Sequence, residues 1–259
     1  MIDADAIEYA QARLQARFGA RPDAVIWRRI EAIREISALF EAARSTAFRP
    51  LVAGLAPDDD VHALEAGLRA HWRELASEVT GWLPGAWQRA AEWFARIPDL
   101  PVIDHLLRGG AAHGWMRADP VFGALAEVEP AARRRALAEG PLVELERSLP
   151  AGDMAPTAIA EAWIAALRER LPEATGDEAT HLDQLGRVLR AHRHAIVTAH
   201  PGEAVVMRQA LAARLETLFR RAAMTPAAGF AFLALAALDF LRLRGEIARR
   251  AALPRFVPS

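Results

Sequence analysis

Histidine is the main candidate for chemistry in this sequence of 259 residues, which contains eight histidines and no cysteine or lysine. Without cysteine the chain has no disulfide framework, cysteine-ligated zinc finger, iron–sulfur ligand or thiol nucleophile. Without lysine it has no Walker A phosphate loop and no pyridoxal Schiff base. The motifs G-x-S-x-G, G-x-G-x-x-G and H-E-x-x-H are also absent. These absences remove many enzyme classes.

Two histidine spacings resemble metal-ligand patterns. His192 and His194 form an H-x-H pair, but residues two apart on a helix point in different directions and share a metal poorly. Glu178-x-x-His181 has the spacing of a di-iron ligand pair, whereas a di-iron bundle needs two such motifs and two further glutamates. The chain holds one copy. We therefore predict no metal site, and a core or interface position for His192.

Two further histidines lie near each other in the sequence. His105 follows Asp104, and His113 lies in a glycine-containing stretch, but no neighbouring residue would orient either one for catalysis. An enzyme of unfamiliar type could use these histidines, or Glu178 with His181. We rank this hypothesis below the two non-catalytic ones that are given at the end of this section. The sequence predicts a protein with no catalytic residue and no cofactor.

Arginine supplies all the positive side chains. The 32 arginines nearly balance 33 acids, so the net charge is −1 and no global basic field attracts nucleic acid. Residues 201–259 carry nine arginines and four acids, a net of +5, which leaves −6 on residues 1–200. The run Arg133-Arg134-Arg135, with acidic neighbours, predicts a solvated helix face. Four arginines are predicted on the polar side of the last helix: Arg242, Arg244, Arg249 and Arg250. They either keep the protein soluble or form a surface for an acidic partner.

Helical periodicity runs through nearly every segment, and strand-like alternation is nowhere sustained. The clearest apolar stripe extends from Val61 to Val79. The three aspartates before it suit the positive end of a helix dipole, and Gly81 predicts its end. Similar stripes are found in residues 7–18, 26–40, 87–97, 163–171, 182–196, 207–218 and about 226–252. The sequence predicts an all-α fold, a multi-helix array of long antiparallel helices.

Glycine and proline mark the organisation of the chain. Gly109 to Pro120 holds three glycines and a proline, which predicts the main loop or a boundary. Prolines and a glycine interrupt residues 121–150 and predict short helices there. We divide the chain into an N-terminal helical repeat, residues 1–115, and a C-terminal helical region, residues 116–259. The two could form one continuous domain.

The sequence gives two indications of location. Residues 1–5 are acidic and lack the basic and apolar segments of a signal peptide. The longest apolar run, Ala227–Leu238, has twelve residues, fewer than the roughly 20 that cross a bilayer. We expect this run to be a buried core helix and the protein to be cytoplasmic.

Three stretches together carry a family resemblance. They are YAQARLQAR at residues 9–17, DLPVIDHLLRG at residues 99–109, and PAAG at residues 226–229 followed by LDFLRLRGEIARR at residues 238–250. In that order they resemble the opening helix, the helix that closes the first repeat, and the last helix of the C subunit, also called d, of V-type ATPases. The chain is shorter than that family, so a repeat around residues 121–170 would be compressed or absent.

The resemblance implies an all-helical, funnel-shaped socket without an active site. Such a subunit sits on the membrane rotor ring, receives the tip of the central stalk and transmits torque, as a peripheral protein on the cytoplasmic face of the inner membrane. Residue matching implies partner contacts for Arg13 and Arg17 on the exposed side of the first helix, and for Arg242, Arg244 and Arg249 facing a polar cavity or the stalk. The alternative is a helical scaffold or protein-interaction module unrelated to ATPases.

Overall fold

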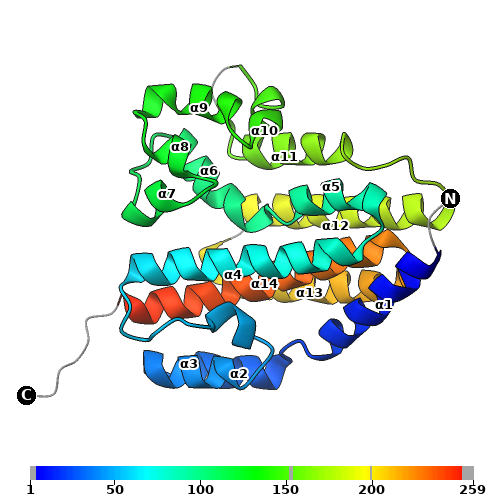
Figure 1. The fold of residues 1–259 in the computed structure, drawn as a ribbon, viewed down its shortest axis with the longest axis horizontal. Coiled ribbons are helices and arrows are strands. Elements are labelled where there is room, and N and C mark those ends of the chain that lie inside the picture. The colour runs from blue at the N-terminus through cyan, green and yellow to red at the C-terminus, as the bar shows by residue number, and fades with distance from the viewer. Residues whose placement is uncertain (1–3, 152–153, 199, 253–259) are drawn as a thin grey trace, which may run out of the picture.

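A computed structural model describes residues 4–151, 154–198 and 200–252. Every regular element within these ranges is a helix, so the predicted all-α fold is confirmed. Figure 1 shows long helices lying side by side in the middle of the molecule, with shorter helices on both sides of them. The funnel shape that the resemblance implies stays a prediction.

The N-terminal part forms a layer of shorter helices, α1 (Ala4–Gly19), α2 (Ala24–Ala32), α3 (Ile36–Arg44) and the 3₁₀ helix η1 (Arg49–Val52). The predicted stripe over residues 26–40 is divided, because α2 ends at Ile33, whose backbone is extended. Arg250, at the far end of the chain, donates hydrogen bonds to the carbonyl oxygens of Ile30, Glu31 and Ile33. It thereby satisfies carbonyl groups that a helix end leaves unpaired. Arg250 is buried, so the prediction that it lies on the polar side of the last helix is wrong.

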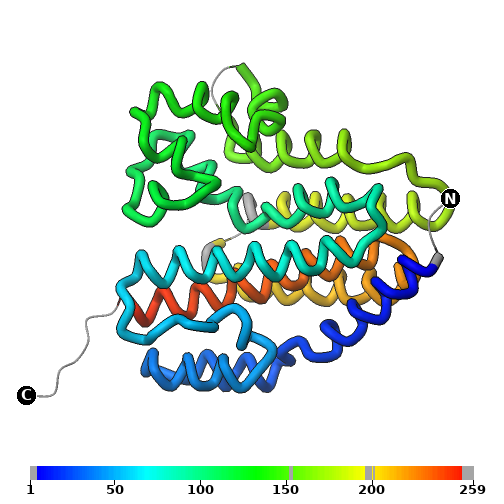
Figure 2. The backbone as a smooth tube through the Cα atoms, in the orientation of Figure 1, coloured from blue at the N-terminus to red at the C-terminus, as the bar shows by residue number. Residues whose placement is uncertain are grey.

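Helices α4 (Val61–Trp82) and α14 (Pro226–Ala251) form the centre of the molecule and lie side by side (Figures 1 and 2). The Asp60 carboxylate starts α4 by accepting hydrogen bonds from the His62 and Ala63 N–H groups. Halfway along, the Trp72 ring stacks on Phe240 with centroids 5.3 Å apart. The helix does not end at Gly81 as predicted: it continues to Trp82 and stops before Pro84, because a residue before proline disfavours helical backbone.

Two further long helices pack beside this pair. They are α12 (Gly176–Thr198) and α13 (Ala204–Arg221), joined through the 3₁₀ helix η4 (Pro201–Glu203). Helix α13 contacts both α12 and α14. The stripes predicted in residues 182–196 and 207–218 belong to these helices, and buried Leu185, Leu211, Leu215 and Leu218 are part of the apolar core.

Short helices cover the other side of α4. They are α5 (Gly85–Phe94), η2 (Ile97–Asp99), α6 (Leu100–Leu107), α7 (Gly114–Ala118), α8 (Gly123–Ala126), η3 (Pro130–Ala132), α9 (Arg133–Glu139), α10 (Val143–Arg147) and α11 (Ala158–Arg168). The short lengths after residue 120 agree with the prolines and glycines there. The stretch from Gly109 to Pro120, predicted as a loop, contains α7, because Trp115 and Met116 are buried.

Helix α14 lies in the apolar core. By length and composition it could cross a membrane, but 72% of its most apolar window is buried against the chain. This burial agrees with the expected core helix. Helix α14 contacts α1, α3, α4 and α5 from the N-terminal repeat and α12 and α13 from the C-terminal region. One apolar cluster contains residues from both ranges.

Candidate functional site

The predicted partner-binding arginines of α1 lie against α4. Arg13 is exposed, and its guanidinium and that of Arg17 lie 5.8 and 5.9 Å from the centroid of the Trp82 ring. Arg17 also forms an ion pair with Glu78, with a distance of 2.7 Å between Nη2 and Oε2. Both side chains remain accessible, so a cationic patch with an aromatic base lies on this side of the molecule.

The predicted arginines of α14 have different surroundings. Arg242 lies over the Trp27 ring at 4.1 Å and pairs with Glu31 at 2.6 Å, which fastens α14 to α2. Arg249 is exposed and pairs with Glu246 on its own helix at 2.8 Å. Arg244 lines a cavity.

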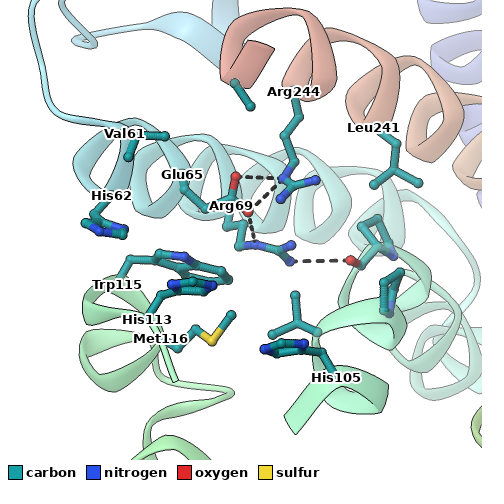
Figure 3. A pocket seen from close by; sticks show the side chains of 14 residues that line it. Val61, His62, Glu65, Arg69, His105, His113, Trp115, Met116, Leu241 and Arg244 are labelled. Atoms are coloured by element: carbon teal, nitrogen blue, oxygen red, sulfur yellow. Dashed lines mark hydrogen bonds and ion pairs between the residues drawn. The ribbon is translucent and has the colours of Figure 1, made fainter. Parts of the chain in front are cut away.

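This cavity, which we call the histidine cavity, has a volume of about 430 Å³. It opens where the start of α4, η2 and α6, α7 and the end of α14 meet (Figure 3). Its polar lining comes from His62, Glu65, Arg69, His105, His113 and Arg244, and its apolar lining from Val61, Pro98, Pro101, Val102, Trp115, Met116, Leu241 and Ala248.

A buried chain of ion pairs forms one wall of the histidine cavity. The Glu65 carboxylate accepts hydrogen bonds from Arg244 Nε at 2.7 and 2.6 Å and from Arg69 Nε at 2.7 Å. Arg69 Nη1 donates to Asp99 Oδ1 at 2.9 Å. Arg69 is only 2% exposed and lies over the Trp115 ring. Burial raises the pKa of Asp99, and the guanidinium groups of Arg69 and Arg73 oppose that rise.

Three exposed histidines also line the histidine cavity. The His113 ring lies between the other two, with its centroid 6.1 Å from that of His62 and 6.1 Å from that of His105. The planes of His105 and His113 are nearly parallel, at 7°. His105 Nε2 donates to the Ala111 carbonyl oxygen at 2.9 Å. That bond fixes its ring at the edge of the cavity.

The position of the loop that carries His113 is fixed by contacts with His105 and Arg133. A Cβ atom at Gly110 would lie 2.3 Å from His105 Cε1, so a larger residue at this position would displace the His105 ring. Arg133 Nη1 donates to the carbonyl oxygens of Leu106 and Gly110 at 2.7 and 2.6 Å. Arg133 is buried, so the predicted solvated face is wrong for this residue, although Arg135 is exposed.

The other histidine candidates are on α12, away from this cavity's lining. His192 is half-buried, and burial, with a smaller effect of Arg214, lowers its pKa. Burial raises the pKa of Glu178. Within the part of the chain that the structure describes, no three His, Cys, Asp or Glu residues are placed to hold a metal ion.

The histidine cavity places imidazole rings beside a network of arginine–carboxylate ion pairs. Glu65 and Asp99 are engaged by arginines, whereas the imidazoles of His62 and His113 are open to solvent. None of the described lining residues carries a hydroxyl nucleophile. Sequence position singled out His105 and His113 as candidates but not His62, Glu65 or Arg69. The spacing of Glu65 and Arg69, four apart on a helix, was a signal for an ion pair.

Comparisons with known proteins found no match: no family model, no curated protein and no solved structure is similar to this chain.

Proposed function

We propose that this chain is a non-catalytic helical subunit of a V-type rotary ATPase that couples the central stalk to the membrane rotor ring during ion transport. The observation that carries the proposal is spatial. The three stretches of the resemblance belong to α1, to η2 with α6, and to α14. Helix α14 contacts both α1 and η2, so segments more than a hundred residues apart in sequence form one assembly.

Binding of acidic partner segments is the action that we assign to this assembly. Arg244 and the histidines lie at one end of α14, and Arg13 and Arg17 lie beside Trp82 near its other end. Arginine forks and aromatic faces are frequent anchors at protein interfaces. In this proposal the protein binds at the cytoplasmic face of the membrane as a peripheral subunit.

Affinity purification of the tagged protein from its own organism, after gentle solubilisation of membranes, tests the proposal. We expect mass spectrometry to recover rotor-ring and central-stalk subunits. Arg244→Gln should reduce their recovery severalfold, while Arg135→Gln, an exposed arginine outside the assembly, should not. Circular dichroism of each variant checks folding.

Recovery of neither subunit, with both detectable in the starting membranes, would overturn the proposal. Reproducible recovery of other proteins in their place would favour the alternative, a helical interaction module unrelated to ATPases. The tagged chain with Arg13→Gln and Arg17→Gln extends the comparison to the second predicted contact.

A further inference from the structure

A second cavity, of about 300 Å³, lies beside α4 on the side of α5 and η2. From the donor groups that line it we infer that this cavity, the Arg96 cavity, binds a small molecule through a phosphate or carboxylate group. Its lining residues are Trp72, Arg73, Ala76, Ser77, Thr80, Glu92, Ala95, Arg96, Asp99 and Val121. It is distinct from the histidine cavity and independent of the ATPase proposal.

Arg96 is the central observation. It is half-buried at the junction of α5 and η2, and burial lowers its pKa. Its arginine neighbours have carboxylate partners: Arg73 pairs with Asp119 at 2.8 Å and Arg170 with Glu144 at 2.7 Å. Asp99 and Glu92 attract the Arg96 guanidinium electrostatically, but no described carboxylate lies within the 4.0 Å of an ion pair. A partly buried cation with no carboxylate in direct contact is unfavourable, so an anionic ligand in contact with it would stabilise it.

Two buried polar atoms in the same lining also lack partners. Arg73 Nε and Thr80 Oγ1 are inaccessible to solvent and make no hydrogen bond within the described chain. Buried polar groups are nearly always hydrogen-bonded, and exceptions call for an explanation. Small rotations of these side chains would let both donate to an oxyanion beside Arg96, with the exposed Ser77 hydroxyl at the rim.

The nearby acids leave room for such a ligand. Asp119 directs both carboxylate oxygens to Arg73. Asp99 lines the cavity and attracts Arg96 electrostatically, but its Oδ1 accepts a hydrogen bond from Arg69. Glu92 is exposed at the rim, where water screens its charge. The donors therefore remain available, and phosphate and carboxylate match the fork of a guanidinium.

The remaining wall defines the size of the ligand. Trp72, Ala76, Ala95 and Val121 provide an apolar surface next to the donors. The volume is at the lower limit of ligand pockets, roughly 300–1,000 Å³. We assign the cavity to a small organic anion whose charged group reaches Arg96 and whose apolar part contacts Trp72.

Isothermal titration calorimetry with inorganic phosphate and with acetate, at constant ionic strength, tests the assignment and distinguishes the two chemical groups. We expect measurable binding of at least one probe. Arg96→Gln should weaken binding by about tenfold or more, the loss of a charge-assisted contact, and Thr80→Val should weaken it severalfold. Arg89→Gln is the matched control, since Arg89 is an exposed arginine of α5 and should leave the affinity within about twofold.

Three results would overturn the assignment. The first is that neither probe binds the wild-type protein. The second is that Arg96→Gln and Arg89→Gln weaken binding equally, as non-specific electrostatic attraction would predict. Loss of binding in Arg244→Gln with retention in Arg96→Gln would place the anion in the histidine cavity instead. Thr80→Val changes a hydroxyl to a methyl group of equal size, so it provides a variant expected to fold if Arg96→Gln does not.

Discussion

At the scale of single residues, arginine connects distant parts of this molecule. Each guanidinium offers five donors in a rigid fork, and one buried side chain can therefore serve two partners. Arg69 bonds Glu65 on its own helix and Asp99 on η2, and Arg250 closes the end of α2 from α14. In a chain without lysine, such multiple contacts are the main polar links between helices.

Arg69→Met should destabilise the protein by about 3 kcal/mol, because it leaves buried carboxylates without their partner. The expected loss is at the lower end of the range for a broken buried pair, since Glu65 keeps Arg244. Urea unfolding measures the change. The control is Arg249→Met, which removes an exposed pair on α14 and should change stability by less than about 0.5 kcal/mol.

The pH dependence of the same variant gives a second test. Burial raises the pKa of Asp99 in the folded state, and Arg69 opposes that rise, so the variant should raise the pKa further. A folded state that holds an extra proton loses stability as pH rises from the unfolded pKa, near 3.8, through the folded value. The difference in free energy of unfolding between wild type and Arg69→Met should therefore become smaller as pH falls from 7 toward 4. A deficit independent of pH would contradict this role of Asp99.

At the scale of elements, the position of α14 depends on one close approach. A Cβ atom at Gly229 would lie 2.5 Å from Leu83 Cδ2 and 3.0 Å from Cδ1, and Leu83 is buried. Gly229→Ala should therefore cost about 1–3 kcal/mol through overpacking. At Gly245, on the same helix, a Cβ would meet nothing within 4 Å. Gly245→Ala should stabilise the helix by about 0.5–1 kcal/mol. Thermal unfolding of both variants measures this difference in sign, and equal effects would contradict the packing argument.

The sequence predicted those elements whose boundaries depend on local chemistry. Asp60 starts α4 through its own carboxylate, and the apolar pattern after Pro226 continues through α14. The break between α2 and α3 was missed, because hydrogen bonds from Arg250, more than two hundred residues away, help to fix it. Residues 109–120 were predicted to be a loop because of their glycines, but the burial of Trp115 and Met116 stabilises the helix α7 there.

The candidate sites were less predictable than the helices. His62, His105 and His113 come from α4, α6 and the loop before α7, and only their packing brings the three rings together. The Arg96 cavity has no sequence signal, because it depends on an arginine for which the fold places no described carboxylate at ion-pair distance. Periodicity identifies which face of a helix is buried, but not which polar residues of different helices meet.

At the scale of the whole molecule, buried contacts join residues 1–115 to residues 116–259. Trp93 and Trp163 exchange hydrogen bonds, each indole N–H donating to the other's backbone carbonyl oxygen at 3.1 Å. Arg21 pairs with Asp239 at 2.8 Å, 218 residues apart. Removing either part would expose the faces of α4 and α14 that pack on each other.

We therefore expect one cooperative unfolding transition, although a chain of this length often populates intermediates. Six of the seven tryptophans precede Met116, so fluorescence follows mainly the N-terminal repeat, whereas far-UV circular dichroism follows helices of the whole chain. Their urea transitions should coincide, as two-state unfolding requires. Separate midpoints would mean that the repeat in residues 1–115 unfolds independently. In that case the contacts of α14 with α4 would contribute little to stability, and a fragment of residues 1–115 should fold alone.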